Sequence, residues 1–104
     1  MTLTGKWKIT AKTPLGSLDL VADFVADEAN GTFTGTATNQ ANGGVYEVAN
    51  GQLDGNAIDY DMVIHFGIIP FNFHLNGHFY EDGTCDGVGS AAKMKGTYEG
   101  YKLD

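Results

Sequence analysis

The amino-acid sequence predicts an all-β protein, an antiparallel up-and-down meander of about eight strands that forms a small barrel. Polar and apolar residues alternate along most of the 104 residues, which is the period of a half-buried strand. Turn pairs such as Asn30-Gly31 and Asp82-Gly83 interrupt this alternation at short intervals. The two halves of the chain also repeat the same order of alternating runs, turns and Gly-rich segments. Two such meanders suggest one closed or nearly closed barrel.

The alternating runs place the expected strands at 3–13, 16–26, 31–38, 44–50, 56–66, 70–80, 84–91 and 93–102. The connections between them are short, and no segment has the periodicity of a useful helix. No linker or change in composition divides the chain. We therefore expect residues 1–104 to form a single domain.

In the best-defined strands one face is apolar and should point into the barrel. The expected inward residues are Trp7, Ile9, Ala11, Leu18, Leu20, Ala22, Phe24, Ile58, Tyr60, Met62, Ile64, Phe66, Phe71, Phe73, Leu75, Gly77, Phe79, Met94 and Tyr98. Burying one Phe or Leu side chain contributes about 1.5–3 kcal/mol, so this face dominates the folding free energy. On the opposite, polar face Val21, Val25 and Val63 are exceptions. They suggest that another copy of the chain covers part of the outside, as in a homo-oligomer.

Charge and cysteine content restrict the partners and the compartment. The net charge is −7, and all six basic residues are lysines. This predicts no binding to nucleic acid, and it disfavours an anionic membrane surface. The single cysteine, Cys85, cannot form an internal disulfide, and the N-terminal residues do not read as a signal peptide. We therefore expect a protein of the reducing cytoplasm.

Short motifs near the N-terminus resemble those of known barrels. Gly5-Lys6-Trp7 opens the first expected strand, and Gly31-Thr32-Phe33-Thr34-Gly35-Thr36 follows the second. This is similar to the opening of the avidin and streptavidin barrels and, more loosely, of other calycins such as lipocalins and fatty-acid-binding proteins. Thr13-Pro14-Leu15-Gly16 and Asp54-Gly55-Asn56 also look like small bacterial lipocalin-like domains. The resemblance implies a calycin-like barrel that Trp7 plugs at one end and that has a small hydrophobic cavity. Biotin binding is not carried over, because avidins surround biotin with several tryptophans and this chain has one.

The leading functional hypothesis is a non-enzymatic module that binds a small apolar or aromatic ligand in the barrel lumen. The expected ligand-binding residues are Trp7, Phe24, Tyr60, Met62, Phe73, Met94 and Tyr98. An eight-stranded barrel is just wide enough either to hold a small ligand or to be filled by side chains. A filled barrel that acts as a structural accessory subunit therefore remains an alternative. No cofactor is expected in either case.

A second alternative is a small barrel isomerase or cyclase, in which a His–Asp pair acts as general base. Its catalytic residues would be His74, His78 and Asp61. If the strands around them form a hairpin, one register sets His65 opposite His74 and Asp61 opposite His78. Another register sets His65 opposite Asn72 and Asp59 opposite His78. In both registers the pair points away from the apolar face, so catalysis would need a partner subunit to complete a pocket.

Two other chemistries are disfavoured. His74 and His78 lie four residues apart on one expected strand, about 13 Å at roughly 3.3 Å per residue, so they cannot share a metal ion. No metal site is expected. Cys85 has no nearby Lys or Arg in the sequence to stabilise its thiolate, and the adjacent Asp86 should raise its pKa. We therefore expect Cys85 to be a half-buried structural residue and not a nucleophile.

Overall fold

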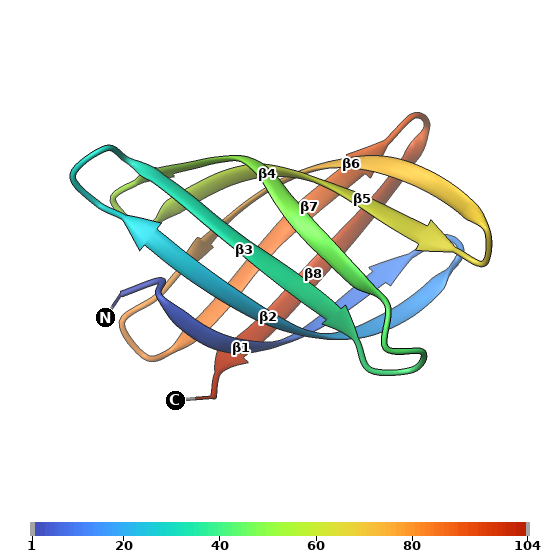
Figure 1. Cartoon of the computed structure of the whole chain (residues 1–104), viewed down its shortest axis with the longest axis horizontal. Helices are drawn as coiled ribbons and strands as arrows, with labels where there is room; N and C mark the ends of the chain where they lie inside the picture. Colours follow the sequence, from blue (N-terminus) through green and yellow to red (C-terminus); the bar gives the residue numbers. More distant parts are fainter. Residues whose placement is uncertain (1, 104) are drawn as a thin grey trace.

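The computed structural model describes residues 2–103, which form a closed barrel of antiparallel strands (Figure 1). The strands are β1 (Gly5–Thr13), β2 (Gly16–Asp27), β3 (Thr32–Asn39), β4 (Val45–Asp54), β5 (Ala57–Phe66), β6 (Ile69–Phe79), β7 (Thr84–Ala91) and β8 (Met94–Lys102). Each strand pairs with the next, and β8 returns to pair with β1. The prediction of an all-β meander of eight strands is confirmed.

Most expected strand boundaries agree with the structure to within two residues, and β4 is the exception. From the sequence this strand is expected to end at residue 50, because Asn50-Gly51 reads as a turn. In the structure the strand continues to Asp54, and Asn50 with Gly51 forms an irregularity where the register shifts between Ala49 and Gln52. Asn50 has a φ of 55°, and an Asn or Gly at a positive φ serves a bulge as readily as a turn.

Side chains fill the barrel, and every residue expected to point inward is buried or partly buried. The expected face was assigned on only five strands. The other three strands contribute Phe33 and Ala37 from β3, Tyr46 from β4, and Cys85 and Ala91 from β7. On the outside, Val25 and Val63 remain exposed in the single chain. No helix suited to crossing a membrane occurs in residues 2–103.

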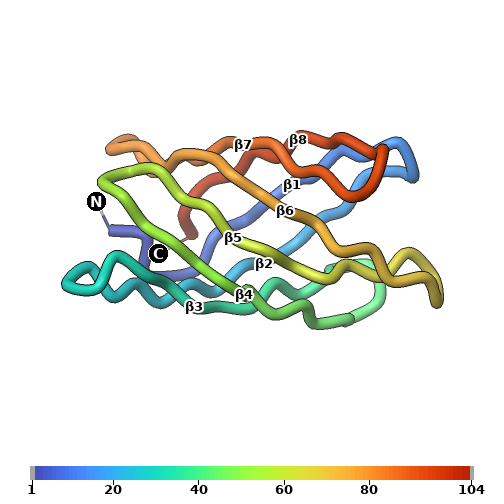
Figure 2. Tube along the Cα trace, turned by 90° about the horizontal axis from the view of Figure 1, so that it is seen from above, coloured from blue at the N-terminus to red at the C-terminus, as the bar shows by residue number. Residues whose placement is uncertain are grey.

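The meander sorts the connections to two ends of the barrel (Figures 1 and 2). The β1–β2, β3–β4, β5–β6 and β7–β8 turns lie together at one end, which we call the hairpin end. The other three turns lie with the chain termini at the opposite end, the terminus end. This sorting follows from the antiparallel order, because alternate turns of a closed meander must fall at opposite ends.

Trp7 is fully buried near the start of β1, at the terminus end. Its indole Nε1 donates a hydrogen bond to the carbonyl of Leu3 at 2.8 Å, which satisfies its only polar group. The Lys102 ammonium lies 5.9 Å from the centre of the indole ring and donates to the Thr2 carbonyl at 2.9 Å. The N-terminal segment and β8 therefore cover Trp7.

Candidate functional site

The interior offers almost no room for a ligand. It contains a cavity of about 30 Å³, against roughly 300–1,000 Å³ for ordinary ligand pockets. Of the expected ligand-binding residues, Phe24, Tyr60, Met62 and Tyr98 line this cavity. The other three, Trp7, Phe73 and Met94, lie in or against the core but do not line it. These seven residues therefore point inward as predicted. They pack in the core of the barrel and leave almost no room for a ligand.

Two glycines make room for the ring of Tyr98. A Cβ atom added at Gly77 or at Gly87 would lie 2.5 Å from the Tyr98 hydroxyl oxygen. The ring therefore occupies the space that side chains would take on the inner wall of β6 and β7. Its buried hydroxyl has no hydrogen-bond partner among the described residues, although the hydroxyl of Tyr60 is near enough to influence it. Burial raises the pKa of Tyr98 to about 12, so the hydroxyl is neutral.

The polar residues of β5 and β6 meet on the outer face of the barrel, in a register that neither hairpin prediction gave. Asp61 lies opposite His74, Asp59 opposite Asn76, and His65 opposite Pro70. Both predictions were wrong because they allowed a longer turn. The structure has a two-residue turn at Gly67-Ile68, in which Gly67 has a φ of 66°. A tight turn of this kind fixes the register of the whole hairpin.

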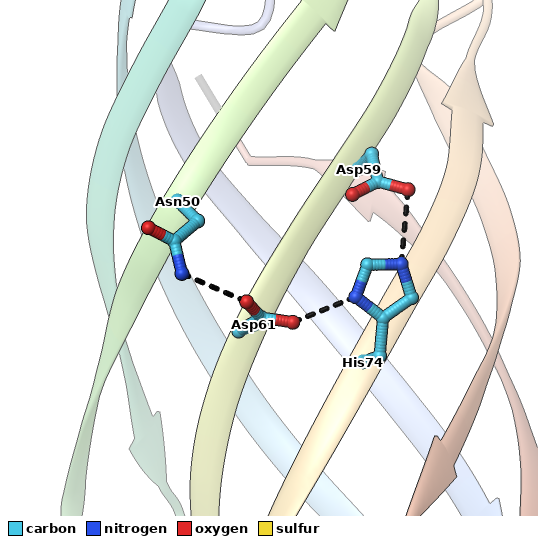
Figure 3. Close-up of polar contacts among 4 residues, drawn as sticks. All are labelled: Asn50, Asp59, Asp61 and His74. Atoms are coloured by element: carbon cyan, nitrogen blue, oxygen red, sulfur yellow. Dashed lines mark hydrogen bonds and ion pairs between the residues drawn. The ribbon is translucent and has the colours of Figure 1, made fainter.

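His74 lies between two carboxylates (Figure 3). Its Nδ1 is 2.6 Å from Oδ1 of Asp61, and its Nε2 is 3.0 Å from Oδ2 of Asp59. From the β4 irregularity, the Asn50 side-chain amide donates to Oδ2 of Asp61 at 2.9 Å. We call these four residues the His74 clasp, since they link the outer faces of β4, β5 and β6.

The clasp favours the charged form of each partner. The hydrogen bond to Asp61, followed by the influence of Asp59, raises the pKa of His74 above its usual value. The hydrogen bond from Asn50, followed by that to His74, lowers the pKa of Asp61. An imidazolium that donates from both nitrogens fits these contacts. Because the His74 side chain is 51% exposed, solvent weakens each interaction.

This geometry does not favour His74 as a general base. Both ring nitrogens already face carboxylates, so neither is free to take a proton from a substrate. His78 does not join the clasp: it lies opposite Ala57, and its ring stacks on Tyr80 with centroids 6.4 Å apart. No group of three or more His, Cys, Asp or Glu side chains able to hold a metal ion is present in residues 2–103.

A groove of about 660 Å³ lies on the outer wall over β6, β7, β8 and β1, and we call it the wall groove. It is lined by Lys12, His74, Asn76, Val88, Gly89, Ser90, Lys95, Gly96 and Thr97. The strand pairing arranges its outward side chains in two rows. One runs Asn76, Val88, Thr97 and Lys12 across four strands, and the other runs His74, Ser90 and Lys95 across three. Lys12 and Lys95 place positive charge at the β8–β1 side of the groove. The hydroxyls of Ser90 and Thr97 lie between these lysines and the β6 side.

No feature of the sequence pattern predicts the wall groove. Its residues occupy alternate positions on ordinary-looking polar strand faces. Lys12 and Thr97 become neighbours only because β8 closes against β1. No spacing rule within one strand could have found this pairing, since it joins the two ends of the chain.

Cys85 is buried, more completely than expected, and is unpaired. Burial, followed by the negative charge of Asp86, raises the pKa of the thiol to about 12. The prediction that Asp86 raises this pKa is confirmed. A thiol so rarely ionised is a poor nucleophile and suits a structural position.

Comparison with other proteins adds no family to this description. No protein-family model matches the chain, and neither the curated proteins nor the solved structures contain a match. The closed eight-stranded antiparallel barrel is consistent with a calycin-like fold.

Proposed function

We propose that this protein is a non-enzymatic binding module that holds a small organic anion in the wall groove, on the outside of a filled barrel. The observation that carries the proposal is a contrast in volume: about 660 Å³ in the groove and about 30 Å³ in the lumen. Of these two, the wall groove alone is large enough for an ordinary ligand. A second outer hollow of about 700 Å³, over β4, β5 and β6, is lined by Glu47 and Asp61, whose carboxylates disfavour an anion.

The groove combines the groups that recognise an amphipathic anion. Lys12 and Lys95 supply positive charge at one side, and the hydroxyls of Ser90 and Thr97 can donate hydrogen bonds nearby. Val88 supplies an exposed apolar surface at the centre of a row. On the far side, the carboxylates of Asp59 and Asp61 lie beyond His74. This gradient favours a ligand whose anionic group faces the lysines and whose apolar part lies over Val88.

The other functional hypotheses receive less support from the geometry. A ligand in the lumen would have to displace core side chains. A His74 base would first have to leave its two carboxylate partners. A purely structural accessory subunit agrees with the filled core, but it leaves the lysine-lined groove without a role.

Two finer assignments belong to the same proposal. We place the protein among the calycins, supported by the closed meander and by the buried Trp7 after Gly5. We place it in the cytoplasm, supported by the unpaired, buried Cys85.

A titration followed by backbone amide NMR shifts tests the function. Phenyl phosphate is the anionic probe and phenol is the neutral control. We expect phenyl phosphate to shift the amides of β7, β8 and the end of β1, and phenol to bind more weakly. The K12E/K95E variant should lower the affinity by about tenfold or more, because two attractive charges become repulsive.

The matched control is K8E, because Lys8 lies on the same strand as Lys12 but outside the groove lining. Its affinity should stay within about twofold at physiological salt, where screening acts over about 8 Å. Shifts confined to residues around Tyr60 and Met62 would show a lumen site instead. Equal loss in K8E and K12E/K95E would also contradict the proposal.

A further inference from the structure

Apolar side chains project into solvent from the turns at the hairpin end. Ile68, at the tip of the β5–β6 turn, is 95% exposed, and the following Ile69 is 57% exposed. Leu15, in the β1–β2 turn at the same end, is 51% exposed. Both views show the β5–β6 hairpin reaching far out along the long axis of the barrel (Figures 1 and 2). Ile68 is therefore placed to contact whatever approaches this end first.

Charged residues are separated along the same axis. None of the four turns at the hairpin end contains Asp or Glu, and neither do the two residues on each side of them. The turn residues at the terminus end and their immediate neighbours carry five acids: Asp27, Glu28, Asp54, Glu81 and Asp82. The hairpin end has lysines: Lys93 in the β7–β8 turn, with Lys95 and Lys12 close behind it on β8 and β1. The terminus end also carries Lys6 and Lys102, but its five acids outnumber them. The barrel is thus basic at one end and net acidic at the other.

We propose that the hairpin end docks on an anionic lipid surface. Ile68, Ile69 and Leu15 would enter the headgroup layer, and the lysines would contact lipid phosphates and carboxylates. Reversible attachment to a lipid surface requires two weak interactions, the insertion of apolar side chains and the attraction of basic side chains to anionic headgroups. The acidic terminus end would point away from the membrane.

The net charge of −7 argues against an anionic surface only if the whole molecule acts as one point charge. The barrel is 37 Å long, whereas screening at physiological salt acts over about 8 Å. A surface that touches the hairpin end is therefore influenced by the lysines there and is nearly insulated from the acids at the far end. The net charge of the whole chain therefore does not argue against docking at this end.

A lipid surface fits this end better than a folded protein partner does. The barrel measures 24 by 19 Å across, so a partner seated on the end alone would cover about half of the roughly 800 Å² per side of a standard interface. The apolar side chains also stand on separate turns and do not form a flat patch. Headgroups can part around separate tips, whereas a rigid partner would need a matching hollow for each.

Co-flotation with lipid vesicles tests the inference. One set of vesicles contains phosphatidylcholine with roughly one-third phosphatidylserine, and the other contains phosphatidylcholine alone. We expect the protein to float with the anionic vesicles and to remain mostly unbound with the neutral ones. Two variants, I68S/I69S and K93E, should each lower the partition coefficient by about tenfold.

The matched controls make the same kinds of substitution at positions away from the hairpin end. Leu103 lies at the terminus end with 51% exposure, so L103S removes a comparable apolar side chain. K8E makes the same charge change as K93E, but on the barrel wall. Both controls should keep vesicle binding within about twofold. Equal losses in the controls, or full binding by I68S/I69S, would overturn the inference.

Two further outcomes separate this inference from its rivals and from the proposed function. If I68S/I69S lowers the mass of the protein measured by sedimentation without lipid, the hairpin end is an interface between copies and the lipid inference is wrong. Ile68, Ile69 and Lys93 do not line the wall groove. If vesicles are not bound while phenyl phosphate still binds, the lipid inference alone fails.

Discussion

The His74 imidazole and the Asp61 carboxylate face each other across β5 and β6, with Nδ1 and Oδ1 2.6 Å apart. The contact joins two directly paired residues, so the backbone register itself positions it. Asn50 extends the contact to the neighbouring β4, and Asp59 extends it along β5. The arrangement ties three strands together on the outer face, and its charge depends on pH.

Replacing His74 by Asn should lower the stability of the protein in a pH-dependent way. The folded-state pKa of His74 is raised above 6.5, so its contribution is complete below that value and is lost as the pH rises through the folded pKa. The pKa of Asp61 is lowered from 3.8, so its contribution is present above that value and is lost as the pH falls through the folded pKa. The wild type should exceed H74N by a few degrees in Tm between about pH 4 and 6.5.

Thermal unfolding followed by circular dichroism across pH 3–9 measures this difference. The control is H78N, since His78 stacks on Tyr80 and has no ion pair among the described residues. Added salt should shrink the H74N difference, because the clasp is half exposed. A difference that does not change with pH would contradict the imidazolium assignment.

Tyr98→Phe should leave the protein as stable as the wild type or stabilise it by up to about 1 kcal/mol. The substitution removes a buried hydroxyl that has no hydrogen-bond partner within residues 2–103, and such a group carries a desolvation penalty. Tyr46→Phe is the matched comparison. The Tyr46 hydroxyl accepts from the Asn39 side-chain amide at 3.2 Å and donates to the His65 carbonyl at 3.4 Å. Its loss should cost about 1 kcal/mol in urea unfolding, and the reverse ranking would contradict this account.

Small apolar molecules should not stabilise the wild type, because the lumen is filled. Benzene should leave Tm unchanged, whereas a binder with an open lumen would gain Tm in proportion to occupancy. Met62→Ala should cost about 2–5 kcal/mol and enlarge the cavity that Met62 lines. The variant, unlike the wild type, should then regain stability on addition of benzene. A rise in Tm of the wild type would restore the lumen hypothesis.

Cys85 should react slowly with iodoacetamide while the protein is folded. The thiol is buried and its pKa is raised to about 12, so thiolate is scarce at neutral pH. Unfolding in urea should speed alkylation, measured by mass spectrometry, by about a hundredfold or more. A C85S/S17C variant, which places a thiol at an exposed position, should react quickly without urea. Rapid reaction of native Cys85 would show that the thiol is accessible.

The periodicity of the sequence was enough to predict the eight strands, their order and the inward face, because strand alternation and turn residues are local properties. Trp7 and Phe73 were placed correctly by this reasoning. The same reasoning predicted a contact between a His on β6 and an Asp on β5. It did not predict which His meets which Asp, because the register of a hairpin depends on the length of its turn. Two residues in the β5–β6 turn set Asp61 opposite His74 and left His78 elsewhere.

The sequence by itself thus determined the eight strands, apart from the end of β4, and the inward face of five of them. Only the tertiary structure decided which distant residues meet. Closure of β8 on β1 brought Lys12 beside Thr97, and the tight packing of Tyr98 over Gly77 and Gly87 decided that the lumen is filled. The meander likewise gathered Ile68 and Lys93 at one end and the acidic turns at the other. Net charge is a sum over the whole chain and does not say where the charged residues lie. The two ends of the barrel could therefore be distinguished only from the tertiary structure.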